Sequence, residues 1–425
     1  MNKILSTLFV GIDVSSKTNH IYAMDFKQNE LLNFKVKNDL PGSKTLINKI
    51  VVCLQSNQLT HLIIACESTS NYSIHLSSNL AANEKLLAFH SKVFCLNPKQ
   101  TKGYKKSFSQ NSKSDPFDAL VISDFARVGK ITSKPWNGSQ HIAIKRLARH
   151  RYHLAHSLSR EKNYTLNNIY LKFSHLAVFA KDIDLFSHNF SATGMAVLTE
   201  FYSPEEIINT PLDELIDFMV KASKNSFKDP EAKAKLLKKA ARDSYKLDKL
   251  SYDPLNTAIA SSFNVINSYK RELKVVNKSL KKLIRGFNSN QYQCLISIPG
   301  IGPIFTAGIL AEIGSIQFFD SNNALAQYAG ITWKHSQSGN FSKDETPMNK
   351  TGNRYLRYYL IEAANTVRKF APEYKAYYRK KYNESLTHKH KRALVLTARK
   401  LIRLIFALLS KNQLYSNSKV ESELI

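Results

Sequence analysis

The stretch Leu8-Phe9-Val10-Gly11-Ile12-Asp13-Val14 decides how the N-terminal part of this chain folds. Aliphatic residues stand at every second position from Leu8 to Val14, which is the two-residue period of a β-strand. Asp13 falls on the opposite face of that strand. A charged group within a strand is costly unless it pairs or binds a metal. The stretch therefore predicts a strand that presents a carboxylate with a function.

The residues that follow predict a mixed sheet flanked by helices, with the element order βββαβαβα. Further strands are expected at His20–Phe26, Leu31–Lys37, His61–Cys66 and Lys92–Leu96, and helices from Pro41 to about Leu54, from about Asn71 and from Asp115. The first three strands follow one another closely and should be antiparallel, because parallel strands need long crossovers.

The chain's composition points to a polyanionic partner. Its 425 residues carry 61 Lys and Arg against 33 Asp and Glu, a net charge of +28, which favours nucleic acid. No apolar run approaches the length of a membrane span, and no signal peptide or C-x-x-C pair is recognisable. We therefore expect a soluble cytoplasmic protein, associated with the nucleoid and not with a membrane.

The length predicts more than one domain. We expect an α/β domain at residues 1–135, a basic helical connector at 136–290, a mostly helical domain at 291–410 and a polar tail at 411–425. The connector looks poorly cored. Within it, Ile266, Tyr269, Leu273, Val276, Leu280 and Leu283 follow coiled-coil steps, although a helix packed on its own domain explains them equally well.

Four carboxylates are the candidate metal ligands: Asp13, Glu67, Asp115 and Asp118. Glu67 ends a strand that would be central in the sheet, and Asp115 and Asp118 share one face at a helix start. Carboxylates that converge repel one another unless divalent cations, Mg²⁺ or Mn²⁺, neutralise them. Taken singly, Asp115 is equally well explained as a helix cap and Asp13 as a turn acid.

Three features of the C-terminal region are candidate nucleic-acid contacts. Pro299-Gly300-Ile301-Gly302-Pro303 resembles a helix-hairpin-helix turn, in which Gly300 and Gly302 would offer backbone amides to a phosphate. Lys350 precedes a helix on which Arg354 and Arg357 share a face suited to phosphates. A purely structural turn and a solvated basic face are the alternatives.

The polar loop around Ser338, which also holds Lys334, His335 and Ser336, is the other singular site. A serine nucleophile needs an exposed hydroxyl, a route for its proton and positive charge near its target. Polar loops hold many idle serines, so the spacing alone does not select Ser338.

These motifs, in this order, resemble those of the IS110/IS1111 group of insertion-sequence transposases. The resemblance rests on an ordered set of segments: Gly11–Ser15, Cys66–Thr69, Lys113–Ala119, Ile298–Pro303, Tyr328–Ile331, Gln337–Gly339 and Thr351–Arg357. The set is specific although no single segment is. The middle of the chain matches only in character, and Pro116 and the segment Asn349–Gly352 depart from the usual pattern.

The resemblance implies a RuvC-like, RNase-H-type domain with a metal site at Asp13, Glu67, Asp115 and Asp118. It also implies a catalytic serine at Ser338, with Ser336 left open, and a structured guide RNA beside donor and target DNA. The protein would be a site-specific recombinase, working as a homo-oligomer (dimer or tetramer) through a serine-phosphate intermediate. A metal-dependent nuclease such as a Holliday-junction resolvase, and a non-catalytic nucleic-acid-binding protein, are the alternatives.

Overall fold

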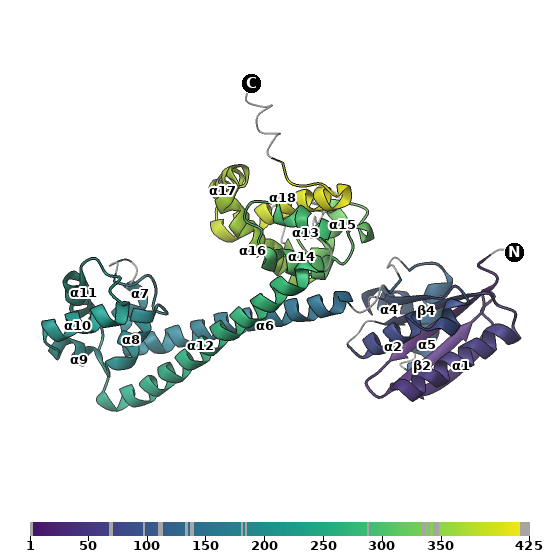
Figure 1. Cartoon of the computed structure of the whole chain (residues 1–425), viewed down its shortest axis with the longest axis horizontal. Helices are drawn as coiled ribbons and strands as arrows, with labels where there is room; N and C mark the ends of the chain where they lie inside the picture. Colours follow the sequence, from purple (N-terminus) through teal and green to yellow (C-terminus); the bar gives the residue numbers. More distant parts are fainter. Residues whose placement is uncertain are drawn as a thin grey trace, which may run out of the picture. The chain divides into compact units, whose positions relative to one another are not determined.

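The computed structural model describes residues 3–67, 71–96, 98–108, 114–131, 135–136, 140–179, 182, 185–286, 289–333, 337–338, 341–342 and 348–416 (Figure 1). The chain divides into two compact units. The first comprises Met1–Ala143 with Ile313–Leu325, and the second comprises Ile144–Glu312 with Ala326–Ile425.

The first unit is built on the predicted mixed sheet, whose five strands are all confirmed. They are β1 (Thr7–Val14), β2 (Thr18–Met24), β3 (Glu30–Lys37), β4 (His61–Glu67) and β5 (Lys92–Leu96), in the spatial order β3-β2-β1-β4-β5. The pairs β1·β2 and β2·β3 are antiparallel, as their short connections require. The pairs β1·β4 and β4·β5 are parallel, so the carboxyl ends of these three strands meet at one edge.

Helices cover both faces of this sheet. They are α1 (Leu40–Ser56), α2 (Tyr72–Ala81), α3 (Glu84–Leu87), α4 (Pro98–Lys105) and α5 (Asp115–Arg127). The aliphatic face of β1 packs against apolar residues of α1, α2 and α3 in one core. Phe9, on the other face, packs against α5 in a second core. The alternation read from the sequence thus assigns each side of β1 to a different helical layer.

Gly11 sets how closely α5 approaches the sheet. A Cβ atom at this position would overlap the carbonyl oxygen of Ala119 and the backbone of Ser123, both on α5. The Ser123 hydroxyl donates a hydrogen bond of 2.9 Å to the carbonyl of Phe9. The absence of a side chain at Gly11 therefore lets the middle of α5, at Ala119 and Ser123, lie against β1.

The region expected to be a poorly cored connector contains a compact helical core, so that expectation was wrong. Its helices are α6 (Gln140–Lys172), α7 (Ser174–Phe179), α8 (Ala192–Glu200), α9 (Pro204–Asn209), α10 (Leu212–Ser223), α11 (Pro230–Arg242) and α12 (Lys249–Arg285). Buried residues of α7–α11 pack between the end of α6 and the first half of α12. The lysines of α11 hid this core, because they alternate with fully buried positions such as Ala234 and Leu237.

The predicted seam on α12 is confirmed only in part. Ile266, Val276 and Leu280 are buried, but the series then continues at Ile284, while Leu283 is 41% exposed. A straight helix has 3.6 residues per turn, so a strict 3.5-residue pattern drifts off one face. This helix packs beside α6 of its own chain, where Arg151 Nε donates to Asn277 Oδ1 over 2.8 Å.

The C-terminal part is mostly helical, as expected. Its elements are α13 (Ser289–Ile296), α14 (Pro303–Ile313), the 3₁₀ turn η1 (Ile316–Phe318), α15 (Asn322–Ala329), the strands β6 (Thr332–Trp333), β7 (Gln337–Ser338), β8 (Phe341–Ser342) and β9 (Met348–Asn349), and the helices α16 (Arg354–Phe370), α17 (Pro372–Glu384) and α18 (Lys389–Lys411). The segment expected to be an irregular polar loop holds two short antiparallel ladders, β6·β9 and β7·β8. Within the described ranges, no helix combines the length and apolarity that crossing a membrane demands.

Candidate active site

Three of the four predicted carboxylates meet at the carboxyl edge of the parallel strands. The register of β1 and β4 pairs Ile12 with Cys66, so Asp13 and Glu67 follow at neighbouring positions. Asp118 belongs to the first turn of α5, the helix that Gly11 allows to lie close to β1. Asp13, Glu67 and Asp118 together line a cavity of about 470 Å³.

Asp115 stands apart from these three. Its side chain is 60% exposed, it does not line the cavity, and its carboxylate is 4.0 Å from Lys35 Nζ. The sequence predicted that Asp115 and Asp118 share one helix face; both lie in the first turn of α5, but only Asp118 lines the cavity.

The electrostatics of Asp13 reflect this crowding. Burial, followed by the negative charges of Asp118, Asp115 and Glu67, raises the pKa of Asp13 to about 6. Burial also raises the pKa of Glu67, against a hydrogen bond from Thr101 that lowers it. Concentrated negative charge of this kind attracts a cation, because a cation relieves both the repulsion and the lost solvation.

Residues of α4 supply the positive side of the cavity, and the sequence analysis missed them. Lys105 forms an ion pair with Asp118, and the Thr101 hydroxyl donates to Glu67. Lys102 and Lys106 also line the cavity. The basic run that follows β5 was a usable signal, because a segment after a parallel strand emerges at the same edge as the carboxylates.

The carboxylates fit a divalent metal by their chemistry. Mg²⁺ and Mn²⁺ favour carboxylate oxygens, and Asp13, Glu67 and Asp118 offer only oxygen donors on one cavity. Among the described residues, no three His, Cys, Asp or Glu are already grouped closely enough to hold an ion. Asp118 and Glu67 instead contact Lys105 and Thr101.

The predicted nucleic-acid contacts lie in the second unit and differ in their surroundings. Lys350 and Arg354 are exposed. Arg357 is half-buried, and its Nη1 donates to the carbonyls of Ala329 and Lys350 over 3.1 Å each. A phosphate contact by Arg357 would therefore have to use its other nitrogens.

The two glycines in the turn between α13 and α14, Gly300 and Gly302, have different surroundings. Gly300 has a φ of +93° and packs so tightly on α16 that a Cβ atom would crowd Val367. Gly302 has open space where its side chain would be. Packing against α16 therefore explains the glycine at position 300, whereas the surroundings of Gly302 do not require a glycine.

Ser338 ends strand β7, which pairs with β8 through Ser338 and Phe341. The described residues place its backbone in a two-residue antiparallel ladder. Ser336 and the neighbouring Lys334 and His335 lie outside the described residues.

A family model for transposases of the DEDD IS110 type matches residues 10–171. A second model, for transposases of the IS116/IS110/IS902 family, matches residues 292–379. Together the two models cover more than half of the chain. The first contains the four candidate carboxylates, and the second contains Ser338 and the candidate nucleic-acid contacts.

A curated relative is the transposase for insertion sequence element IS1111A of Coxiella burnetii, 27% identical over 163 residues. The match spans 38% of this chain and 42% of the relative, which is less than half of that protein's length. Among solved structures, RuvC of T. thermophilus in complex with a Holliday junction substrate aligns with 31% of this chain and 99% of its own, at 17% identity and a TM-score of 0.23.

Proposed function

Because the chain belongs to the IS110 family of insertion-sequence transposases, we propose that it cuts and rejoins DNA to move such an element. The observation that carries this proposal is the cavity shared by Asp13, Glu67 and Asp118 with three lysines. Acidic groups suit a metal ion and the lysines suit phosphates, which is the pairing that phosphoryl transfer requires. The surplus of 28 positive charges supports a nucleic-acid substrate.

Asp13, Glu67 and Asp118 would hold the metal, with Asp115 at the margin. When bound, a divalent ion such as Mg²⁺ or Mn²⁺ activates an attacking oxygen and stabilises a departing one. The lysines of the cavity would bind the phosphate. Lys105 pairs with Asp118, and together with Lys102 and Lys106 it would offer positive charge to a phosphate oxygen at the cavity.

We infer that Ser338 is the nucleophile of the strand exchange. Its hydroxyl oxygen would bond to a DNA phosphorus while the bond from that phosphorus to the next nucleotide's oxygen breaks. The hydroxyl proton leaves, and the departing oxygen takes up a proton. Support comes from the family match over residues 292–379 and from the basic residues Lys350 and Arg354 nearby in the chain. Ser336 is the competing candidate.

A structured guide RNA and a homo-oligomer complete the proposal. The basic positions of α6, α11 and α12 offer long positive surfaces suited to a folded RNA. A dimer or tetramer would let the metal site of one copy and the serine of another act on the same DNA. The partly exposed Leu283 and Val275 of α12 leave apolar surface for such an assembly.

The test is a recombination assay with purified protein, RNA transcribed from the element's flanks, and donor and target DNA. We expect strand exchange that depends on a divalent metal and a covalent protein–DNA adduct that survives denaturant. Ser338→Ala should remove the adduct and the exchange while DNA binding persists. Ser336→Ala should keep both.

The same assay separates the competing functions. Metal-dependent cleavage that is untouched by Ser338→Ala would point to a nuclease or junction resolvase that uses the first unit alone. Binding with no metal-dependent reaction in any variant would leave only a nucleic-acid-binding protein.

A further inference from the structure

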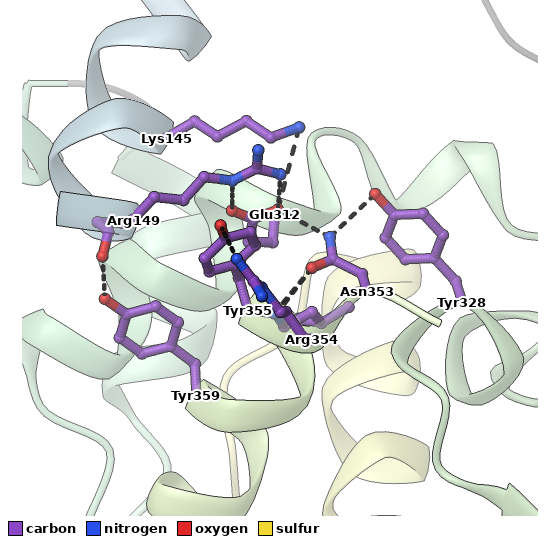
Figure 2. A network of polar contacts seen from close by, with 10 residues as sticks. Lys145, Arg149, Glu312, Tyr328, Asn353, Arg354, Tyr355 and Tyr359 are labelled. Atoms are coloured by element: carbon purple, nitrogen blue, oxygen red, sulfur yellow. Dashed lines mark hydrogen bonds and ion pairs between the residues drawn. The ribbon is translucent and has the colours of Figure 1, made fainter. Parts of the chain in front are cut away.

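A buried carboxylate in the second unit lies outside the site described above. Glu312, in the last turn of α14, has no exposed side-chain surface. Arg149 of α6 grips it with two hydrogen bonds, from Nε at 2.7 Å and from Nη2 at 2.9 Å, and Lys145 Nζ is 4.0 Å away (Figure 2). Burial by itself would raise the pKa of Glu312, but Arg149 and Lys145 outweigh it and the pKa is lowered. Glu312 is therefore an anion.

A buried ion pair such as Glu312–Arg149 contributes little to stability on its own. Removing two charges from water costs several kcal/mol, and apolar residues of similar volume often stabilise a core as well or better. A third hydrogen bond on Glu312 points to another purpose. Asn353 Nδ2 donates to Glu312 Oε2 over 2.7 Å, so the carboxylate links α6 to the residue that precedes α16 (Figure 2).

Asn353 uses each of its polar groups to fix the start of α16. Its Oδ1 accepts from the backbone N–H groups of Tyr355 and Leu356, which caps the helix. Its Nδ2 donates to Glu312 and to the Tyr328 hydroxyl at 3.2 Å, and its backbone N–H donates to the Tyr328 carbonyl. Glu312 accepts only, so it dictates which end of the amide faces the helix.

Near the start of α16, residues 328–330 contact residues 349–353. Gly330 and Gly352 pack so closely that a Cβ atom on either would overlap the backbone of the other. Arg357 Nη1 bridges the carbonyls of Ala329 and Lys350, on the two sides of that contact. Residues 328–330 and 349–353 are thus joined, and in the sequence they flank the stretch that carries Ser338.

The two cations that hold Glu312, Arg149 and Lys145, also reach the surface. Arg149 stacks on the Tyr355 ring at 4.4 Å, and Arg354 lies over the same ring at 4.9 Å (Figure 2). About a third of the side chains of Arg149 and Lys145 is exposed. Glu312 thus holds Arg149 and Lys145 close to the exposed Arg354. All of them lie near the start of α16, and a helix start favours phosphate.

We propose that Glu312 is a positioning residue for strand exchange, which through Arg149 and Asn353 sets the start of α16 and the contact between residues 328–330 and 349–353, which flank Ser338 in the sequence. This inference rests on the proposed function. Glu312 touches no substrate and acts through the groups it holds. Loss of the link misplaces Arg354 and these two stretches relative to DNA, and misplacement of about 1 Å can slow a reaction roughly 100-fold.

The decisive variant is Asn353→Ser, because serine still caps a helix but cannot reach Glu312 and Tyr328. We expect an unchanged melting temperature, DNA affinity within about twofold, and single-turnover strand exchange slower by roughly 10- to 100-fold. Glu312→Gln should slow exchange to a similar extent but also lower the melting temperature, since its amide turns a donor toward Arg149 or Asn353 and leaves the Arg149 charge without its partner. The control is Glu384→Gln, which breaks an exposed pair with Lys381 and should leave exchange unchanged.

A second variant separates positioning from support of the fold. Arg149→Met combined with Glu312→Leu replaces the pair by apolar side chains and should keep the melting temperature at or above that of the parent. Exchange should stay low, because Asn353 still lacks its partner. Recovery of exchange together with stability would show that the network only supports the fold. Should the double variant not fold, Asn353→Ser decides alone, and wild-type exchange in it overturns the proposal.

Ser338→Ala, run in parallel, keeps the two proposals distinct. Wild-type exchange in Ser338→Ala refutes the serine mechanism, and the exchange rate of Asn353→Ser then decides the role of Glu312. Hydrogen exchange at the backbone amide of Asn353 gives an independent measure. The exchange rate should be higher in Glu312→Gln than in the parent protein. Equal rates would count against the link between Glu312 and Asn353.

Discussion

At the scale of single residues, the site depends on which carboxylates face the cavity. Asp13, Glu67 and Asp118 line it, whereas Asp115 is exposed and close to Lys35. Asp115 still adds to the repulsion felt by Asp13. Four acids that look equivalent in the sequence therefore have unequal surroundings.

This inequality gives the first prediction. Asp13→Asn and Asp118→Asn should each abolish metal-dependent strand exchange, because each removes an oxygen donor from the cavity. Asp115→Asn should lower it by roughly 10- to 100-fold, as the loss of outer groups around metals does. Asp13→Asn should keep or raise the melting temperature, since it removes a buried, repelled charge. Equal loss in Asp115→Asn and Asp118→Asn would contradict the placement.

At the scale of elements, the contact between β1 and α5 sets the distance between Asp13 and Asp118. Gly11→Ala should cost about 1–3 kcal/mol of unfolding free energy, because its Cβ atom overlaps the backbone of α5. Gly103→Ala is the matched control. Its Cβ atom meets nothing within 4 Å in α4, so it should gain about 0.5–1 kcal/mol of helix propensity. Denaturant unfolding of both variants tests this, and an unaffected Gly11→Ala would refute the close packing.

The helical core of the second unit contains a buried lysine, Lys172, whose charged form is disfavoured by burial. Lys172 at the end of α6 donates to the carbonyls of Leu198 and Phe201 over 2.8 and 2.6 Å. Burial lowers the pKa of Lys172 to about 8 from 10.5. Between these values the unfolded chain binds more protons than the folded one, so this lysine makes stability rise with pH through that window.

Lys172→Met tests that sign. The parent protein should gain up to about 3 kcal/mol from this group between pH 8 and pH 10, and Lys172→Met should lose that gain. Lys278→Met, at an exposed position of α12, should keep the slope of the parent. Melting temperatures at pH 7.5 and pH 9.5 provide the measurement. A slope identical in all three proteins would show that Lys172 does not titrate in this range.

At the scale of the whole molecule, the net charge of +28 governs how the protein meets nucleic acid. Binding to DNA or RNA should weaken steeply as salt rises, because each phosphate contact releases counterions. Lys102→Gln and Lys106→Gln should each reduce the slope of log affinity against log salt by about 1 if both lysines contact phosphates. Affinity that hardly responds to salt would argue for an acidic protein partner.

The sequence by itself determined the strands of the first unit and the residue types that its candidate site would use. Alternation along Leu8–Val14 predicted β1 and the face of Asp13, and the short connections predicted the antiparallel strands. These features are local, because side-chain period and turn length depend on neighbours in the chain. The placement of Glu67 beside Asp13 followed from the same reasoning.

Only the tertiary structure decided which groups surround those residues. It set Lys105 against Asp118 and left Asp115 outside, and it joined Glu312 to Arg149 and Asn353 across 163 and 41 residues. It also assembled a core from short helices, among them the lysine-rich α11, in a region whose sequence predicted a poorly cored connector. Such contacts depend on how helices pack onto one another, and that packing is a property of the whole fold that no local pattern records.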